Sequence, residues 1–399
     1  MATFRVEFLG CKVSHADVQE VREALLADGH VECHGDERAD VAVISGCCVT
    51  NEAVAKSRKA AARAARAHRR VYLTGCAANL PAASLAGLPA AVTVVARRSE
   101  ETAAFVAGDV GAIGCIQADA RLDRVRAFVK IQDGCSFSCN FCVIPLVRGQ
   151  SRSRLAAAVL REVHRRVDQG HKEIVLTGIN LGCFRDRASG YDLPRLVREA
   201  GATPGLERLR LSSIEINHVD DRLAAALLET PTVGRHLHVP LQSGDDGVLR
   251  AMRRRYTTAT FLRRLEPLAA EFNLTTDVIV GFPDEDEAAF GRTLATIERA
   301  GITSVHVFPY SPRPGTATER DDRVPAQVKR ERGATLRALS RELSERRWRG
   351  KVGSRDRVLV DRPGRGYGDD YSPWLVDAPV GSIVSVRAAA VTEEGILAA

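Results

Sequence analysis

The sequence lacks two kinds of long apolar segment. No stretch approaches the about 18 consecutive apolar residues that a membrane-spanning helix needs, so no such helix is predicted. The first residues, MATFRVEFLGCKVS, lack the basic start and the apolar run of a secretory signal. Low-complexity tracts and convincing repeats are missing as well. We therefore expect a cytoplasmic protein of ordinary globular composition, because 45% of its 399 residues are hydrophobic and 27% are charged.

Ten cysteines are present, and in a reducing cytoplasm they indicate metal binding or catalysis more than disulfides. Three of them, Cys135, Cys139 and Cys142, lie at C-x3-C-x2-C spacing in DGCSFSCNFCVIPLVRG. Structural zinc usually takes four protein ligands, and no fourth His or Cys follows nearby. An iron-sulfur cluster on three thiolates would keep one iron open for a substrate or cofactor. The alternative of three small buried hydrophobic residues fits this spacing poorly.

A second set of cysteines follows predicted strands. Cys11 comes after FRVEFLG, Cys47 after VAVISG and Cys76 after VYLTG. If these strands are parallel, the three thiols meet at the carboxyl edge of one sheet, where open α/β proteins bind ligands. A chance distribution of ten cysteines is the alternative, and spacing alone does not decide between the two. Cys48 competes with Cys47 for the position, whereas three other cysteines match no ligand pattern: Cys33, Cys115 and Cys183.

Strand-like runs alternate with amphipathic helices over most of the chain. FRVEFLG, VAVIS, VYLTG and AVTVVA predict an open α/β sheet, which we expect to be parallel. AFVKIQ, EIVLTGIN, LERLRLSS, HLHVPLQS, TTDVIVGF and SVHVFPYS predict a full or partial β/α barrel. A charged helix over 326–349 follows, and the remaining short strands are typical of a small β-barrel. The predicted domains are 1–115, 121–349 and 350–399.

The net charge of +7 is carried partly by clustered bases, which together predict a nucleic-acid partner. A single such run would more often be a solvated helix face. One predicted helix, capped by Asn51, would carry bases at steps of three and four: Lys56, Lys59, Arg63, Arg66 and Arg70. Two further runs contribute Arg148, Arg152 and Arg154, and Arg253, Arg254, Arg255, Arg263 and Arg264.

The cysteine spacing, with the aromatic Phe141 before the last cysteine, is the signature of radical S-adenosylmethionine enzymes. The whole chain resembles their methylthiotransferase family, which joins an N-terminal cluster domain, a radical barrel and a C-terminal TRAM domain. It is most similar to the tRNA threonylcarbamoyladenosine methylthiotransferase (MtaB-type) branch, through LGCKV, CVTNEAVAKSRKA, KIQDGC, RGQSRSR, EIVLTGIN, HLHVPLQSGDD, MRRRYT and DVIVGFPDE. Ser14, Ser45, Gly46 and Cys48 depart from the commoner family residues, but none of these departures removes a presumed ligand.

The resemblance implies two 4Fe-4S clusters and S-adenosylmethionine. Cys135, Cys139 and Cys142 would hold the radical cluster, and Cys11, Cys47 and Cys76 an auxiliary one, with Cys47 preferred to Cys48 by its place before VTN. The implied cofactor-binding residues are Phe141, Thr177, Gly178, Ser212, Glu215 and Gln242. Each could instead be an ordinary core, turn or rim residue. His236 and His238 alternate on one strand, where packing or a rim contact is favoured over a metal.

The implied reaction is methylthiolation of C2 of N6-threonylcarbamoyladenosine beside the anticodon. A 5′-deoxyadenosyl radical would activate C2, the auxiliary cluster would supply sulfur, and a second S-adenosylmethionine the methyl group. We expect a monomer. The resemblance implies two partners for it, a tRNA anticodon stem-loop and a low-potential electron donor. The bases expected on tRNA phosphates are Lys56, Lys59, Arg63, Arg66, Arg70, Arg152 and Arg154. The alternatives are the isopentenyladenosine-specific enzyme, a two-cluster electron-transfer protein, and an RNA-binding protein with structural clusters.

Overall fold

The computed structural model describes residues 2–33, 37–97, 99–111 and 125–399. Cys115 therefore lies outside the described residues. The chain divides into two units. The first unit contains the N-terminal residues together with Asp133–Ser151 and Ser311–Arg320, and the second contains Leu122–Gln132, Arg152–Tyr310 and Asp321–Ala399. No helix among the described residues has both the length and the apolar character to cross a membrane.

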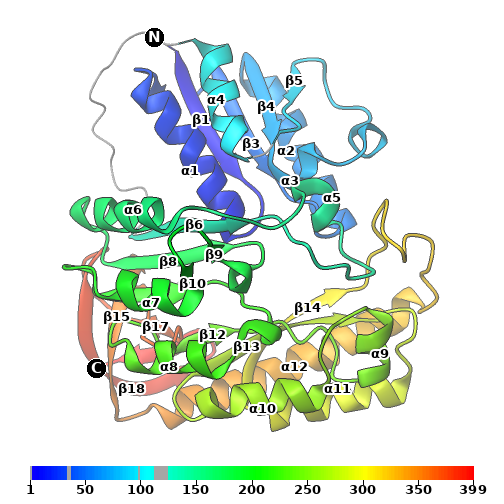
Figure 1. Ribbon diagram of the computed structural model, residues 1–399, viewed down its shortest axis with the longest axis vertical. Helices are drawn as coiled ribbons and strands as arrows, with labels where there is room; N and C mark the ends of the chain where they lie inside the picture. Colours follow the sequence, from blue (N-terminus) through cyan, green and yellow to red (C-terminus); the bar gives the residue numbers. More distant parts are fainter. Residues whose placement is uncertain (1, 34–36, 98, 112–124) are drawn as a thin grey trace. The chain divides into compact units, whose positions relative to one another are not determined.

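The first unit is built on a parallel sheet with strand order β2-β1-β3-β4-β5 (Figure 1). Its strands are β1 (Thr3–Phe8), β2 (Val31–Glu32), β3 (Val41–Gly46), β4 (Arg70–Thr74) and β5 (Val92–Val94). The predicted open parallel sheet is confirmed. The two-residue strand β2 was not predicted, because two residues carry no detectable alternation.

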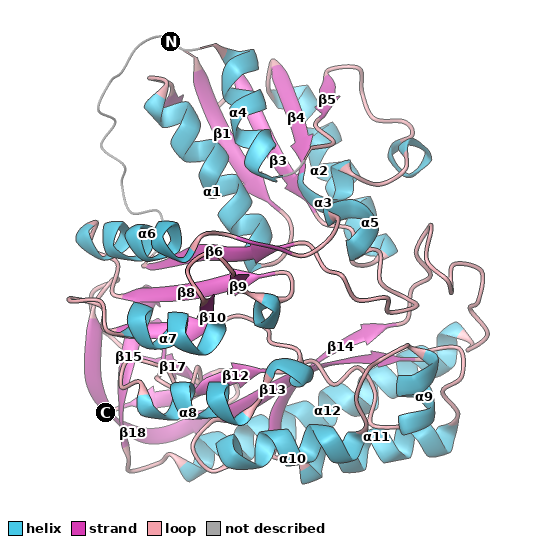
Figure 2. Cartoon of the chain, viewed as in Figure 1, coloured by secondary structure: helices cyan, strands magenta, loops and turns pink. Residues whose placement is uncertain are grey.

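Helices cover both faces of this sheet (Figure 2). The helices of the first unit are α1 (Lys12–Ala27), α2 (Asn51–Ala67), α3 (Gly75–Ala78), α4 (Ser99–Val110) and α5 (Ile144–Arg148), with a 3₁₀ turn at Ala82–Leu85. One core joins Phe4 and Tyr72 of the sheet to Leu25 of α1, and the other joins Ile44 to Ala61 of α2. Alternate strand residues thus point to opposite helical layers.

The strand order of the first unit places its direction change between β1 and β3. Beginning at β1, the chain adds β2 on one side and then β3, β4 and β5 on the other. In such doubly wound sheets, ligands bind outside the carboxyl ends of the strands at this switch point. The topology therefore singles out the segments that follow β1 and β3, which begin near Cys11 and Cys47.

The second unit contains the six predicted barrel strands, all confirmed, in two sheets with orders β11-β8-β6-β7 and β12-β13-β14. The six strands are β6 (Arg126–Asp133), β8 (Glu173–Gly178), β11 (Arg208–Leu211), β12 (His236–His238), β13 (Asn273–Val280) and β14 (Ile302–Pro309). Pairing is parallel for β6, β8 and β11 and again for β12, β13 and β14. The Ile214 amide donates to the His238 carbonyl oxygen at 2.9 Å, which joins the two sheets into a partial barrel.

Amphipathic helices pack outside the partial barrel around one large apolar core. These helices are α6 (Ala156–Asp168), α7 (Leu193–Gly201), α8 (Asp221–Glu229), α9 (Asp246–Ala251), α10 (Thr258–Ala269), α11 (Glu287–Arg299) and α12 (Ala326–Gly350). Short elements complete this part: β7 (Arg152–Ser153), β9 (Arg185–Asp186), β10 (Tyr191–Asp192) and 3₁₀ turns at Leu181–Cys183 and Ile216–His218. The predicted long charged helix corresponds to α12.

The C-terminal residues form a closed five-stranded barrel of order β15-β16-β17-β19-β18. Its strands are β15 (Arg355–Arg362), β16 (Arg365–Tyr367), β17 (Pro373–Leu375), β18 (Ile383–Thr392) and β19 (Gly395–Ala398). Trp374 is 1% exposed at the centre of its core. The small β-barrel predicted from the Gly- and Pro-rich turns is confirmed.

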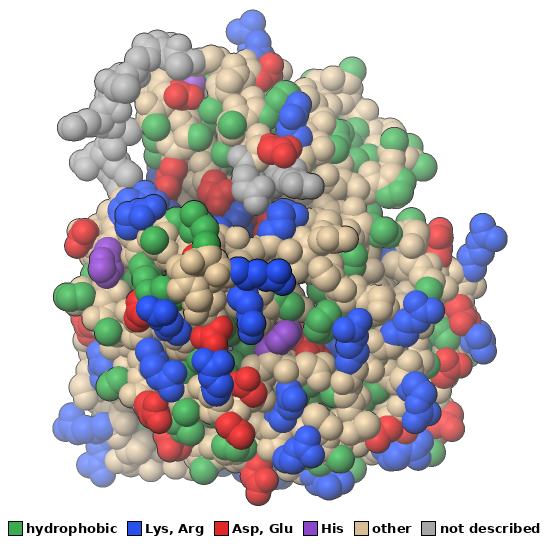
Figure 3. All heavy atoms as spheres, viewed as in Figure 1, with side chains coloured by type: hydrophobic (Ala, Val, Ile, Leu, Met, Phe, Trp, Pro, Cys, Tyr) green, Lys and Arg blue, Asp and Glu red, His purple; other side chains and the backbone are tan. Residues whose placement is uncertain are grey.

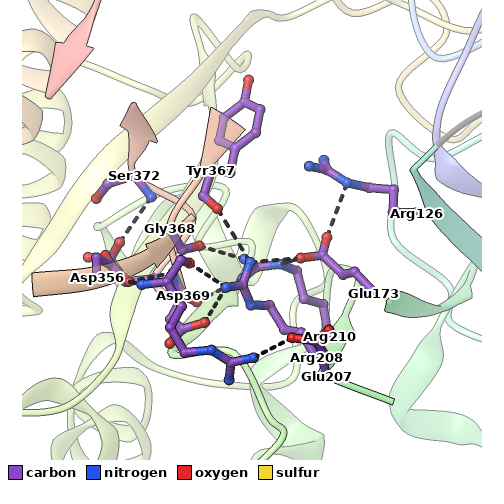
Figure 4. A network of polar contacts seen from close by, with 12 residues as sticks. Arg126, Glu173, Glu207, Arg208, Arg210, Asp356, Tyr367, Gly368, Asp369 and Ser372 are labelled. Carbon is purple, nitrogen blue, oxygen red and sulfur yellow. Dashed lines mark hydrogen bonds and ion pairs between the residues drawn. The ribbon is translucent and has the colours of Figure 1, made fainter. Parts of the chain in front are cut away.

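A buried polar network holds the C-terminal barrel to the strands of the second unit (Figure 4). Glu173 of β8 forms ion pairs with three guanidinium groups, those of Arg126, Arg208 and Arg210, at 3.0–3.1 Å. Burial by itself raises the pKa of Glu173, but the three cations outweigh it and lower this pKa to about 2. The carboxylate is therefore ionised, and it neutralises part of the charge of three buried arginines.

Two of these arginines, Arg208 and Arg210, also donate to backbone carbonyl groups of the C-terminal barrel. Arg210 binds the carbonyl oxygens of Gly368 at 2.7 Å and Asp369 at 2.9 Å, and Arg208 binds that of Tyr367 at 3.3 Å. In addition, Tyr371 stacks on Tyr367 with ring centroids 4.7 Å apart. The barrel is thus fixed to β11 by charge-assisted hydrogen bonds, which are stronger than neutral ones.

Candidate cluster and cofactor sites

The structure brings Cys11, Cys47 and Cys76 to one edge of the first unit's sheet. Cys11 is the N-cap of α1 after β1, Cys47 follows β3, and Cys76 lies in α3 directly after β4. A Cβ atom at Gly10 would lie 3.6 Å from Cys47 Cβ, and Gly46 bridges Gly75. Burial raises the pKa of Cys47, and the neighbouring thiolates of Cys76 and Cys11 raise it further. The predicted convergence is therefore seen, whereas the ligand role of these thiols stays a prediction.

Cys48 lies in an apolar pocket that also contains Cys76. It is fully buried and packs with Val54, Leu80 and Val143. A hydrogen bond with Cys76 raises the pKa of Cys48 and lowers that of Cys76. Adjacent residues project in different directions, so Cys47 and Cys48 have distinct environments, and Cys48 has the one typical of a packing residue.

Arg148 interacts directly with Cys76. Its Nε lies 3.0 Å from Cys76 Sγ, and its two Nη atoms donate to Asp17 at 2.7 Å and Asp133 at 3.2 Å. The Arg148 side chain is only 6% exposed. The sequence predicted that Arg148 belongs to an exposed basic run, and this prediction is wrong. Its ion pairs with two carboxylates and its contact with a thiol keep the side chain buried. A cation at this position favours the thiolate form of Cys76.

The C-x3-C-x2-C cysteines lie in a tight loop between β6 and α5. Gly134 opens the loop with φ at +70°, and a Cβ there would lie 2.1 Å from the Gln150 carbonyl oxygen, so only glycine fits. The Cys135 amide donates to the Gly149 carbonyl oxygen at 3.0 Å, which closes the loop. Cys135, Cys139 and Cys142 are all partly exposed. Three accessible thiols on one short loop fit a cluster that is held by three protein ligands.

Two buried hydroxyl groups at strand ends of the second unit lack hydrogen-bond partners. They belong to Thr177, near the end of β8, and Ser212, which directly follows β11. The two strands are neighbours, and the Ser212 amide donates to the Leu176 carbonyl oxygen at 2.9 Å. Unpaired buried hydroxyl groups are costly unless a ligand pairs with them. Both residues therefore suit the predicted cofactor site.

The other predicted cofactor residues have varied surroundings. At Gly178, a Cβ would lie 3.0 Å from Gln132 Oε1, so glycine permits the close approach of β6 and β8. Glu215 accepts from the Asn217 amide at 3.0 Å and from Arg254 at 2.9 Å, a partner that the sequence did not reveal. Gln242 has φ of +65°, and its backbone amide donates to the backbone carbonyl oxygen of Asp277 at 2.8 Å. Phe141 is half-buried. Their cofactor roles stay predictions.

Comparisons with known proteins agree with this layout. A model of the radical SAM superfamily matches residues 129–297, and one described as uncharacterized protein family UPF0004 matches residues 3–96. The threonylcarbamoyladenosine tRNA methylthiotransferase MtaB of Bacillus subtilis is 36% identical over 86% of this chain and 82% of its own. The MtaB protein of Thermotoga maritima is 32% identical over 100% of this chain and 96% of its own. The chain belongs to the radical S-adenosylmethionine methylthiotransferase family.

This methylthiotransferase is also similar to relatives that are named for another substrate. A tRNA-2-methylthio-N(6)-dimethylallyladenosine synthase of Clavibacter michiganensis is 34% identical over 92% of this chain and 74% of its own. Among solved structures, the radical S-adenosylmethionine methyltransferase TsrM of Kitasatospora setae matches with a TM-score of 0.58 at 13% identity, covering 79% of this chain and 75% of its own. That likeness shows the fold alone. The relatives together show an enzyme that methylthiolates tRNA with a 4Fe-4S cluster and S-adenosylmethionine.

The bases predicted to contact tRNA are only partly arranged as expected. Helix α2 exposes Lys56, Lys59, Arg63 and Arg66 on one face, as predicted. The helix ends at Ala67, however, so Arg70 begins β4 instead of continuing that face. Asn51 was predicted to cap this helix, but the cap is Thr50. The Thr50 hydroxyl accepts from the Ala53 amide at 3.1 Å. Asn51 begins the helix, and its side chain binds the Pro312 carbonyl oxygen and Arg313.

The second unit offers less free positive charge than its composition suggests. Arg154 donates to Glu162 and to the Lys130 carbonyl oxygen, each at 2.7 Å. On the face shown in Figure 3, the Lys and Arg side chains of this unit are interspersed with acidic ones. On α2, Lys56 pairs with Glu52 at 2.7 Å and Arg63 with Glu7 at 3.0 Å, but all four bases are exposed on one face. This face stays a candidate for phosphate contacts, and Arg152 stays a predicted contact.

Replacing Thr177 with valine should weaken S-adenosylmethionine binding about tenfold, since one hydrogen bond to the ligand is lost. The free energy of unfolding should not fall, because the valine removes an unpaired buried hydroxyl. Calorimetric titration of the reconstituted enzyme with S-adenosylmethionine measures the effect. Thr203→Val is the matched control, since Thr203 also has a buried unpaired hydroxyl but precedes β11. Equal affinity in both variants would remove Thr177 from the cofactor site.

Proposed function

We propose that this enzyme methylthiolates C2 of N6-threonylcarbamoyladenosine beside the anticodon of tRNA. The observation that carries the proposal is its similarity to proteins named MtaB, which spans up to 100% of this chain at 32–36% identity. The Clavibacter relative, named for dimethylallyladenosine, matches 92% of this chain. The segment CVTN, which suggested the threonylcarbamoyl branch, supports the same choice.

A second, auxiliary 4Fe-4S cluster on Cys11, Cys47 and Cys76 is part of the proposal. Support comes from the topology, because these cysteines follow β1, β3 and β4, next to the switch point of a doubly wound sheet. The Arg148 guanidinium, 3.0 Å from Cys76 Sγ, adds a positive charge that a thiolate-ligated cluster would need for balance. The low-potential electron donor that such an enzyme requires belongs to the proposal as well.

The residues of the chain then have separate tasks. When bound, the radical cluster and S-adenosylmethionine supply the 5′-deoxyadenosyl radical that activates an otherwise inert C2–H bond. The Thr177 and Ser212 hydroxyl groups would bind and orient S-adenosylmethionine from the ends of β8 and β11. Arg148 would hold Cys76 as a thiolate. The exposed bases of α2 would position the tRNA through its phosphates without reading its sequence.

The proposal is tested with the anaerobically reconstituted enzyme, S-adenosylmethionine, a reductant and two anticodon stem-loops. One RNA carries threonylcarbamoyladenosine and the other isopentenyladenosine, and the nucleosides are analysed by mass spectrometry after digestion. We expect the methylthio product from the threonylcarbamoyl RNA, and none with a Cys139→Ala control. Product from the isopentenyl RNA alone would assign the enzyme to the other branch.

A further inference from the structure

Two histidines and an aspartate lie together on three adjacent strands of the second unit. His238 ends β12, Asp277 lies in β13 and His306 in β14. Asp277 and His306 are directly paired in the parallel register, and His238 is paired with Thr275. One potential ligand atom from each of the three residues lies within 4.8 Å of the others. All three therefore come from strands, which hold side chains more firmly than loops do.

The distances suit a shared metal ion. His238 Nε2 lies 3.0 Å and His306 Nδ1 3.2 Å from the same oxygen, Asp277 Oδ1. Metal–nitrogen and metal–oxygen bonds of about 2.1 Å place neighbouring ligand atoms about 3.0 Å apart at a right angle and about 3.4 Å apart in a tetrahedron. These two separations lie within this range, and the ligand atoms of the two histidines lie within 4.8 Å of each other. Side-chain rotations would bring all three atoms onto one ion.

The residues around these three side chains also favour metal binding. In the metal-free chain, His238 Nε2 donates to Asp277. When a metal ion replaces that proton, the remaining proton lies on Nδ1 and is donated to the Thr275 hydroxyl, 2.9 Å away. Metal-binding histidines commonly have such a partner on their other nitrogen. Burial alone would raise the pKa of Asp277, but hydrogen bonds from His238 and His306 outweigh it and hold this pKa well below its usual range. The site thus presents an ionised carboxylate and two imidazoles.

We propose that His238, Asp277 and His306 bind one divalent first-row transition-metal ion. Two histidines and a carboxylate are the donor set that suits iron(II), cobalt, nickel and zinc. The His238 side chain is 7% exposed, whereas that of His306 is 64% exposed, so the site is closed on one side and open on the other. The open side leaves coordination positions for water or for another oxygen-donor ligand.

This ion would be distinct from any iron-sulfur cluster, since its ligands include no cysteine. His236 is not a ligand, although it alternates with His238 on the same strand. Its Nε2 lies 3.0 Å from Thr275 Oγ1, and its ring stacks on Tyr371 at 5.0 Å. The sequence preference for packing over metal binding thus fits His236, whereas His238 gains two partners, Asp277 and His306, that are 39 and 68 residues further along the chain.

The test is zinc binding by the anaerobically reconstituted enzyme, with zinc and iron counted in the same sample after dialysis against Zn²⁺. We expect about one zinc per chain at unchanged iron, and its loss in both Asp277→Asn and His306→Gln. His164→Gln, which removes an exposed histidine of α6, should keep the zinc. Unchanged iron in every variant shows that the fold and the cysteine sites survive.

Competition with a chelator then measures the dissociation constant. Thr275→Val keeps all three ligands but removes the hydrogen bond to His238, and should weaken zinc binding about 10–100-fold. Wild-type enzyme that retains no zinc at unchanged iron would overturn the proposal, and so would zinc that persists in the Asp277→Asn/His306→Gln double variant. In either case the three residues form a hydrogen-bonded network only.

Discussion

Replacing Cys47 with alanine should lower the iron content of the anaerobically reconstituted enzyme from about eight to about four atoms per chain, because each cubane cluster holds four irons. The expectation rests on the convergence of Cys11, Cys47 and Cys76 at the carboxyl edge of the first unit's sheet. Methylthiolated product should vanish with the auxiliary cluster, whereas reductive cleavage of S-adenosylmethionine to 5′-deoxyadenosine should persist. Colorimetric iron analysis and chromatography of 5′-deoxyadenosine measure the two quantities.

Two other cysteines serve as controls for this result. Cys33→Ala removes a half-buried cysteine just after β2, and the iron count should stay at about eight. Cys48→Ala removes the buried neighbour that packs with Val54 and Leu80. If iron fell in Cys48→Ala but not in Cys47→Ala, the ligand would be Cys48 and the motif-based choice would be wrong. About four irons in the wild type as well would mean that the first set of cysteines holds no cluster.

Replacing Glu173 with glutamine should destabilise the second unit by about 3–5 kcal/mol, the usual cost of removing one partner from a buried ion pair. The side chain of Glu173 is fully buried and faces Arg126, Arg208 and Arg210, which would lose their shared counter-charge. Urea unfolding followed by tryptophan fluorescence measures the change, since Trp348 and Trp374 both belong to this unit. Glu207→Gln is the matched control, because its partners Lys172 and Arg357 are exposed, and should cost at most about 1 kcal/mol.

The pH dependence of the free energy of unfolding tests the same ion pairs in a second way. The pKa of Glu173 is lowered from 4.5 to about 2 in the folded chain. Its stabilising contribution is therefore complete above about pH 4.5 and is lost as the pH falls toward 2. Over this window the stability of the wild type should fall toward that of Glu173→Gln. A constant difference between the two proteins from pH 7 to pH 3 would contradict the ionised, ion-paired state of Glu173.

The strands could be predicted because their apolar runs are strong. VAVIS and EIVLTG are buried on both faces, and they lie in the strands β3 and β8. Strand β2 has only two residues and carries no such signal. The end of α2 was misplaced because the bases continue at helical spacing past Ala67, although the chain there turns to begin β4 at Arg70. Periodicity locates a helix face well and its last turn poorly.

Site residues that directly follow a strand could be predicted from the sequence. Contacts between segments that are far apart in the sequence could not. Cys11, Cys47 and Cys76 each follow a recognisable strand, so parallel topology was enough to bring them together. Arg148 lies in an arginine-rich run, and its contacts with Asp17 and Cys76 cross 131 and 72 residues of sequence. The arginines of LERLRLSS likewise suggest an exposed strand, but Glu173 and backbone carbonyl groups from β15, β16 and the following turn bury them. No local pattern encodes such partners.

The anchoring of the C-terminal barrel has a consequence for synthesis on the ribosome. Arg208 and Arg210 find their carbonyl acceptors at Arg357, Tyr367, Gly368 and Asp369, about 150–160 residues later in the chain. Domains generally fold as units while the chain emerges from its N-terminal end. The first unit's sheet is complete early, but Arg208 and Arg210 of β11 lack their final partners until the last residues leave the exit tunnel. We therefore expect the second unit to fold only after translation ends, and a nascent chain stalled before residue 357 to stay sensitive to protease in β8 and β11.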